Sequence, residues 1–174
     1  VYKRQVYYNE DWLQAAKYVC SPPIRTAEDR DALWRAIRRG EVQTVSTDHC
    51  SFTTAQKLAG RDNFTAIPGG IPGVPNLKAD ATVRRVCRDF AAEGKVVAAI
   101  CAAPTALAAF GVLNGKKATV YPGMDADLTA AGASYTGLPL TIDGSIVTGE
   151  ALGAAIPFAL ALARILAGAD AANR

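Results

Sequence analysis

The stretch KVVAAICAAPTALAAFG, from Lys95 to Gly111, changes its hydrophobic pattern at one cysteine, Cys101. KVVAAIC is a continuous apolar run, typical of a strand that is buried on both faces of a parallel sheet. AAPTALAAFG is typical of a short helix. A direct strand-to-helix turn at Cys101 would lift its thiol out of the sheet, at a helix N-terminus whose partial positive charge favours a thiolate. Two interpretations follow from the pattern alone: a nucleophile on an elbow, and a small buried hydrophobic residue.

Further helices and strands alternate on both sides of this stretch. Helical spacing, β-branched runs and turn residues predict them at 79–94 (helix), 116–122 (strand), 124–132 (helix), 138–149 (hairpin turned at Asp143-Gly144) and 151–167 (helix). The last helix is so apolar that we expect it to be buried against the sheet. Strands and helices in alternation predict a layered α/β sandwich.

The first third of the chain has a different character. Thr26 followed by AEDRDALWRAIRRG has a capping residue, acids in the first turn and a stop at Gly40, which predicts a helix. Val42–Thr47 is a β-branched run and predicts a strand. Residues 49–75 read as a loop that is unusually long for a compact domain. An alternative is that Val42–Thr47 and Phe64–Ile67 serve as substitute strands and complete a mixed sandwich.

Composition and charge restrict the classes of partner. The 174 residues carry a net charge of +3, and the basic runs RAIRRG and VRRVCRD lie on helical patterns with apolar opposite faces. Solvated helix faces therefore explain them better than a nucleic-acid site does. No apolar run reaches the roughly 18 residues that cross a bilayer. We expect a small-molecule substrate, with no nucleic acid and no membrane as partner.

Two further features concern the cellular compartment and the completeness of the chain. Its four cysteines have no CxxC spacing, which predicts reduced thiols and a cytoplasmic protein. The chain begins at Val1 and its only methionine is Met124, so we expect it to be a fragment.

The segment GKVVAAICAAPTALAAFGVLNGKKATVYPG, residues 94–123, resembles the DJ-1/PfpI superfamily. The resemblance implies a flavodoxin-like three-layer sandwich over residues 75–174, incomplete at its N-terminal side, and a homodimer. It also implies a cysteine protein without a cofactor, which acts on small aldehydes in the manner of a glyoxalase or deglycase, or serves as a redox sensor or chaperone. Cys101 takes the position of the nucleophile, and Gly70, Ala102 and Tyr121 take substrate-binding positions.

The positions at which this sequence differs from the family are those that tune or surround the reactive cysteine. The family's glutamate, which tunes the cysteine from the first helix, has no counterpart here. Tyr121 stands where many members carry a histidine, and GEALGA replaces a common GPGT turn before the last helix. Glu150, in that segment, has no role that the sequence indicates. The thiol is thus retained without its usual tuning partners.

A second resemblance covers about Tyr7 to Val74. AAKYVCSPPIR, ALWRAIRRGEVQTVSTDHCSF and FTAIPGGIPGV are similar to the dihydropyrimidinase and D-hydantoinase branch of the amidohydrolases. This implies a fragment of a TIM barrel in which Val42–Thr47 is the last strand. Asp48 then stands at the position of a zinc-ligating, proton-shuttling aspartate, and Gly69 at that of a backbone contact to the cyclic amide.

The residues around Asp48 argue against a complete metal site. By spacing alone Asp48 is a residue that starts a loop or a ligand, and both interpretations stay open. Asp48, His49 and Cys50 are consecutive, so their side chains cannot all close on one ion. His49 is the only histidine of the chain. A dinuclear zinc site therefore cannot be assembled from this chain alone, and hydantoinase activity is not expected of it.

The segment IPGGIPGVPNL, Ile67 to Leu77, is compatible with both families. We therefore predict a chimera joined there, with a hydantoinase-like part at 1–74 and a DJ-1/PfpI-like part at 75–174. A cysteine protein is the leading functional hypothesis. A metal-dependent hydrolase of cyclic amides and a non-catalytic chimeric fragment are the alternatives.

Overall fold

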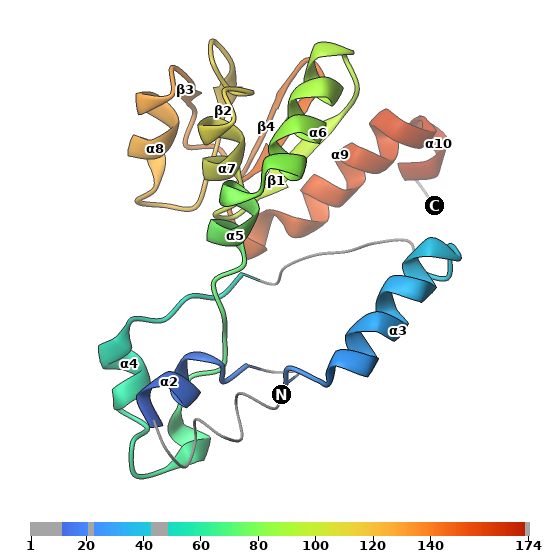
Figure 1. Cartoon of the computed structure of the whole chain (residues 1–174). Helices are drawn as coiled ribbons and strands as arrows, with labels where there is room; N and C mark the ends of the chain where they lie inside the picture. The colour runs from blue at the N-terminus through green and yellow to red at the C-terminus, as the bar shows by residue number, and fades with distance from the viewer. Residues whose placement is uncertain (1–11, 21–22, 43–48, 173–174) are drawn as a thin grey trace. The chain divides into compact units, whose positions relative to one another are not determined.

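The computed structural model describes residues 12–20, 23–42 and 49–172 of the chain (Figure 1). It divides into two compact units, Val1–Gly73 (unit 1) and Val74–Arg174 (unit 2). Apart from Val42, the predicted strand Val42–Thr47 lies outside the described residues. In the part of the chain that is described, no helix has both the length and the apolar character that a membrane span requires.

Unit 1 contains short helices, the longest of which is the predicted one. Its described elements are α2 (Trp12–Lys17), α3 (Ala27–Arg38), α4 (Thr54–Leu58) and the 3₁₀ turn η1 (Phe64–Ala66). Thr26 caps α3 through a capping box with Asp29, because each side chain accepts a hydrogen bond from the backbone N–H of the other residue, at 3.2 and 3.0 Å. This confirms the predicted start of the helix.

The predicted loop and substitute strand in unit 1 need correction. Residues 49–75 carry α4, because Thr53 and Gln56 form a second capping box that starts a helical turn. Phe64–Ile67 does not form a strand, since Phe64–Ala66 is a 3₁₀ turn. The turn follows Asn63, whose side-chain oxygen accepts hydrogen bonds from the N–H and hydroxyl of Thr65 and so fixes a tight local conformation.

A buried lysine holds several segments of unit 1 together. Lys57 is only 4% exposed, and its Nζ donates hydrogen bonds to the carbonyl oxygens of Val19 (3.0 Å), Pro68 (2.5 Å) and Gly70 (3.2 Å). The ammonium group also lies 5.4 Å from the centre of the Phe52 ring. Burial lowers the pKa of Lys57. The carbonyl oxygens replace the water that a buried ammonium loses, and they connect residues that are distant in sequence.

Unit 2 follows the predicted alternation of helices and strands. Its elements are α5 (Val74–Ala79), α6 (Ala81–Ala92), β1 (Val97–Ile100), α7 (Pro104–Ala109), β2 (Lys117–Ala118), α8 (Asp125–Ala130), β3 (Ser134–Tyr135), β4 (Leu140–Asp143), β5 (Ile146–Gly149), η2 (Leu152–Ala154), α9 (Ala155–Ala167) and α10 (Ala169–Ala172). The helix predicted at 79–94 begins at Ala81, because Asp80 caps it by accepting hydrogen bonds from the N–H groups of Thr82 and Val83. α5 and β3 were not predicted, and β2 is shorter than the predicted strand.

Two small sheets carry the strands. β1 pairs parallel with β5, and β5 pairs antiparallel with β4, so the first sheet has the order β1-β5-β4. β2 and β3 form a second, parallel pair. The predicted hairpin is confirmed, with Asp143 opposite Ile146, but its two-residue loop is Gly144-Ser145. Gly144 takes φ = +62°, as the first loop position of a type II′ turn requires.

The first sheet has one well-covered face and one poorly covered face. Val97 and Ala99 of β1 face a core that they share with α7, Leu113, Val120 and Leu128, and against which α6 packs. Ile100 points to the other side, where Phe158 of α9 meets it beside Gly149. Helices on both sides of a sheet make this a flavodoxin-like α/β sandwich (Figure 1).

The expectation that the last helix is buried was wrong. α9 has no buried residue, and Ile156 is 74% exposed. Leu160 and Leu166 are exposed as well. Within unit 2 the helix contacts β5 and α10, and several of its apolar side chains stay exposed. The helix is as apolar as the sequence indicates, but unit 2 supplies no layer that buries it.

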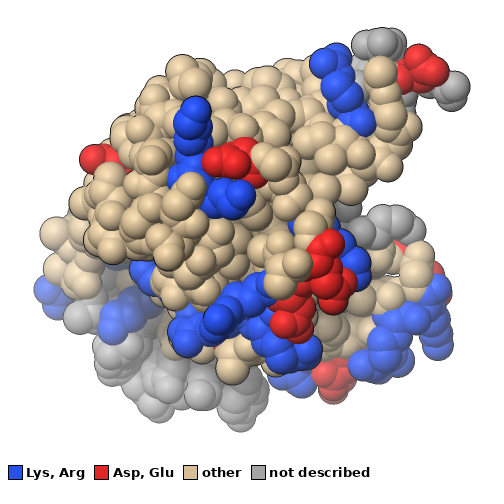
Figure 2. All heavy atoms as spheres, turned by 90° about the horizontal axis from the view of Figure 1, so that it is seen from above, with Lys and Arg blue, Asp and Glu red and all other residues tan. Residues whose placement is uncertain are grey.

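The basic helix faces are solvated, as predicted. The arginines of α3 and α6 are exposed, and Arg85 lies 3.3 Å from Asp89 one turn away. On the face that Figure 2 shows, Lys and Arg side chains lie beside Asp and Glu. Exposed pairs of this kind contribute little to stability, about 0–1 kcal/mol each.

Candidate functional site

Cys101 occupies a strained backbone position at the end of β1. Its φ is +64°, and it is the one non-glycine residue with a positive φ in the part of the chain that the structure describes. Its N–H donates to the carbonyl of Gly149 (3.0 Å), and its carbonyl accepts from the N–H of Tyr121 (2.9 Å). A left-handed conformation costs a non-glycine residue about 1–2 kcal/mol. The two backbone hydrogen bonds hold Cys101 in that conformation, with its side chain partly exposed.

The turn after Cys101 separates the thiol from the helix. α7 begins at Pro104, and Ala103 is its N-cap residue, so Cys101 lies two residues before the cap. The expected position of the thiol directly at the helix N-terminus is therefore wrong. The helix itself has only six residues. Strain in the turn, rather than a helix dipole, is the distinguishing feature of this cysteine.

Ala102 presents a backbone donor beside the thiol. The residue is 4% exposed, and its carbonyl accepts hydrogen bonds from the hydroxyl (2.8 Å) and N–H (3.1 Å) of Thr105. Its own N–H has no acceptor among the residues that the structure describes. A buried N–H without an acceptor is rare in native proteins. It is therefore a natural donor for an oxygen atom of a bound molecule.

Tyr121 and Glu150 lie near this turn in different ways. Tyr121 approaches Cys101 through its backbone, as described above, and its side chain is exposed. Glu150 follows β5 and donates its N–H to the carbonyl of Pro139 (2.9 Å). Within the described ranges, the Cys101 sulfur makes no hydrogen bond and the Glu150 carboxylate forms no ion pair. Neither residue supplies a tuning group for the thiol here.

The sequence did not single out Gly149, although its carbonyl anchors Cys101. A Cβ atom on Gly149 would lie 2.9 Å from Cγ1 of Ile100 and 3.1 Å from Cδ2 of Phe158. Only a residue without a side chain fits between β1 and α9 at this point. A glycine at the end of a predicted strand is the signal that would have indicated a close approach.

The remaining predicted site residues belong to unit 1. Asp48 lies outside the described residues. Gly69 is exposed, whereas Gly70 is buried, with its N–H donating to the carbonyl of Val19 (2.9 Å) and its carbonyl accepting from Lys57. Both backbone groups of Gly70 are thus already engaged within unit 1.

No metal centre is formed by the described residues. They contain no group of three or more His, Cys, Asp or Glu side chains that could hold an ion. The four cysteines are free thiols, and burial raises the pKa of Cys87. These thiols therefore differ in their surroundings, and Cys101 is the one that sits on a strained turn.

The family model and the solved structures that match this chain both point to the DJ-1/PfpI family. The model of the DJ-1/PfpI family matches residues 25–165. The crystal structure of Drosophila melanogaster DJ-1beta superposes with a TM-score of 0.56 at 37% sequence identity, covering 61% of this chain and 57% of that chain. An oxidised DJ-1 of Toxoplasma gondii superposes with a TM-score of 0.54 at 33% identity, covering 61% and 57%.

Two of the curated proteins that this chain matches in sequence are a hydantoinase and a dihydropyrimidinase rather than DJ-1 proteins. A D-hydantoinase of Streptomyces coelicolor is 43% identical over 116 residues, which are 66% of this chain and 24% of that protein. A dihydropyrimidinase 2 of Caenorhabditis briggsae is 35% identical over 133 residues, 75% of this chain and 25% of that protein. The chain thus spans about a quarter of the length of these relatives. Both predicted resemblances are confirmed, and they give the chain the appearance of a chimera.

Proposed function

The chain belongs to the DJ-1/PfpI family, and from this membership we propose that it is a cysteine-dependent protein that acts on small aldehydes, with Cys101 as the nucleophile. One observation carries the proposal: Cys101 is held at φ = +64° by backbone hydrogen bonds on both sides. Strain of this kind is concentrated at functional sites, where the surrounding structure compensates for its cost.

The chemical step that this geometry supports is addition to a carbonyl group. The Cys101 thiolate attacks the aldehyde carbon and a C–S bond forms. The π electrons of the C=O bond move to the oxygen, which takes a proton from water and leaves a hemithioacetal. The N–H of Ala102 is the donor available to the oxygen while it carries negative charge. In this proposal Cys101 forms the bond and Ala102 stabilises the developing charge.

Thiol reactivity and aldehyde loss test this proposal together. We expect iodoacetamide at neutral pH to alkylate Cys101 about 10-fold faster than a free cysteine, measured by peptide mass spectrometry. We expect the purified protein to consume methylglyoxal, and Cys101→Ser to abolish the loss. Cys87→Ser is the matched control and should leave both rates unchanged, because burial keeps the Cys87 thiol protonated.

The outcomes separate activity from mere folding. If Cys101 is alkylated no faster than a free thiol, it is not an activated nucleophile and the proposal fails. Fast alkylation without aldehyde loss would limit the function to a reactive thiol, as in a redox sensor. Absence of both, together with a cooperative thermal melt, would indicate a folded but non-catalytic chain.

A second candidate function rests on the curated relatives. Their names, D-hydantoinase and dihydropyrimidinase, support the alternative that part of the chain derives from an amidohydrolase. The described residues do not supply a metal-binding group, and Asp48 lies outside them, so we derive no step through zinc. Elemental analysis tests this alternative, because a dinuclear hydrolase would retain about two zinc ions per chain. Metal-free protein that consumes methylglyoxal would exclude it.

A further inference from the structure

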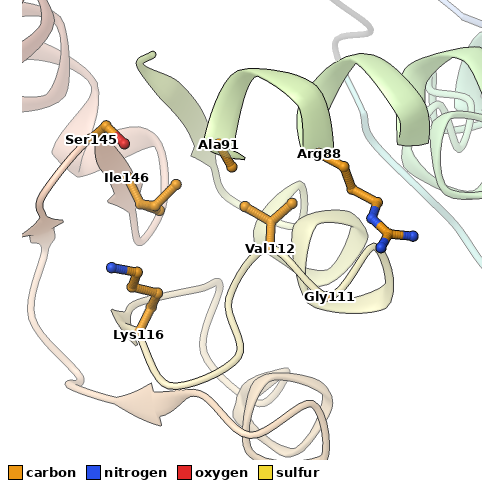
Figure 3. Close-up of a pocket in the computed structure, with 7 residues that line it drawn as sticks. All are labelled: Arg88, Ala91, Gly111, Val112, Lys116, Ser145 and Ile146. Carbon is orange, nitrogen blue, oxygen red and sulfur yellow. The ribbon is translucent and has the colours of Figure 1, made fainter. Parts of the chain in front are cut away.

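A pocket of about 240 Å³ lies in unit 2, away from Cys101 (Figure 3). Ile146, which lines it, is the first residue of β5, whereas Gly149, the carbonyl partner of Cys101, is the last. Three residue steps along β5 separate the two ends, about 10 Å at 3.3 Å per step. The pocket is therefore a site distinct from the nucleophile.

The pocket combines an apolar middle with a basic residue on each side. Ala91, Val112 and Ile146 are its apolar lining residues, of which Ile146 is only 3% exposed. Figure 3 shows Arg88 of α6 and Lys116, which precedes β2, on opposite sides of Val112, with Ser145 on the side of Lys116. The two basic groups thus lie on different sides of Val112.

Arg88 has no acceptor among the residues that the structure describes. Its neighbours on α6 are engaged: Arg85 pairs with Asp89 at 3.3 Å, and the guanidinium of Arg84 lies 5.8 Å from the centre of the Phe110 ring. The Arg88 guanidinium makes no hydrogen bond, ion pair or ring contact in the described ranges. Its planar, forked donors match a carboxylate.

Lys116 retains donors as well. Its Nζ forms a long ion pair with Oδ1 of Asp143, at 3.6 Å, and an ammonium group has three N–H donors, so donors remain for a ligand. The other oxygen of Asp143 accepts the N–H of Lys117 at 2.8 Å, so that carboxylate is anchored to the backbone. The Ser145 hydroxyl makes no hydrogen bond with the described residues. The ammonium and the hydroxyl together form a second donor group, weakened but not neutralised by Asp143.

We propose that this pocket binds a small, linear dicarboxylate. One carboxylate contacts Arg88, the other contacts Lys116 and Ser145, and the hydrocarbon between them lies over Val112. The volume is below the roughly 300–1,000 Å³ of pockets for drug-sized ligands, which suits a molecule of this size. Because Arg88 is exposed and Asp143 partly offsets Lys116, the binding is expected to be weak and sensitive to salt.

Nuclear magnetic resonance titration of the full chain tests the proposal. The probes are succinate, adipate and suberate, with hexanoate as the monoanion and adipamide as the neutral analogue. We expect saturable shifts of the Gly111, Val112, Ser145 and Ile146 amides with an optimum chain length. Hexanoate should bind about 3- to 10-fold more weakly than the best dicarboxylate, since it forgoes one exposed ion pair.

Matched variants locate the contacts. Arg88→Gln and Lys116→Gln should each weaken the best dicarboxylate about 3- to 10-fold and remove its advantage over hexanoate. Arg85→Gln, on the same helix, and Lys117→Gln, the adjacent residue, should change the affinity less than about twofold. Equal binding of hexanoate, equal effects of the control variants, or the absence of saturable shifts would each overturn the proposal.

Discussion

Replacing Cys101 by glycine is expected to stabilise unit 2, although it removes the proposed nucleophile. Cys101→Ala is the reference, because both variants remove the thiol and only alanine keeps a Cβ atom at φ = +64°. Glycine adopts this conformation without steric cost. The difference between the two variants therefore measures the strain of the turn.

The magnitude follows from two opposing contributions. A left-handed conformation costs alanine about 1–2 kcal/mol. Glycine loses about 0.5–1 kcal/mol more conformational entropy on folding. We therefore expect Cys101→Gly to have a free energy of unfolding about 0.5–1 kcal/mol higher than Cys101→Ala. For a unit of about 100 residues this corresponds to a melting temperature higher by about 2–6 °C.

Hydrogen exchange of the β1 and β5 amides in increasing urea reports the stability of unit 2 alone. Ala98→Gly is the matched control, because Ala98 lies exposed in β1 without a positive φ, and it should lower the stability by about 0.5–1 kcal/mol. If Cys101→Gly is no more stable than Cys101→Ala, the turn stores no strain. The observation that carries the proposed function would then lose its force.

Two further predictions concern the neighbourhood of the same sheet. Gly149→Ala should lower the free energy of unfolding by about 1–3 kcal/mol in urea denaturation, because the new methyl group would lie 2.9 Å from Ile100; an unchanged midpoint would show that α9 yields freely. The hydrogen bond from the Lys117 N–H lowers the pKa of Asp143 below its usual 3.8. The Asp143 carboxylate therefore stabilises the folded state above pH 3.8, and this stabilisation is lost as the pH falls through the lower pKa of the folded state. Asp143→Asn should flatten this part of the dependence of melting temperature on pH between pH 2 and 5, and identical profiles would contradict it.

The elements with strong local signals could be predicted from the sequence. The Thr26 cap marks the start of α3, the apolar run of β1 indicates a buried strand, and the turn residues at Asp143-Gly144 indicate the hairpin. In each case short-range backbone chemistry is sufficient. The exact loop of the hairpin shifted by one residue, because the pairing of Asp143 with Ile146 is decided by the register of the whole ladder.

Elements that depend on distant partners were predicted less well. α5 lies in VPNLKA, where a proline suggested a loop, although proline is tolerated in the first turn of a helix. The exposure of α9 depends on how many layers cover the sheet, which hydrophobicity alone does not reveal. β2 and β3 are two residues each and carry no periodic signal.

The candidate site shows the same division. A cysteine between a strand and a helix could be recognised from the pattern around Cys101, but its positive φ and its bond to Gly149 depend on β5, which lies some 45 residues later in the chain. The free N–H of Ala102 is likewise a property of the folded turn. The basic pocket unites Arg88, Lys116 and Ser145 from three separate segments, and only the fold brings them together.

Lys57 gives unit 1 a cross-link that is neither covalent nor dependent on redox conditions. One ammonium group joins the carbonyls of Val19, Pro68 and Gly70, and a neutral acyl group on its nitrogen would break that junction. Because the nitrogen is enclosed in the native unit, an acylating reagent reaches it only in molecules that have transiently opened. Each reaction would remove one molecule from the folded population irreversibly, so the extent of Lys57 acylation would record the opening of unit 1 over time.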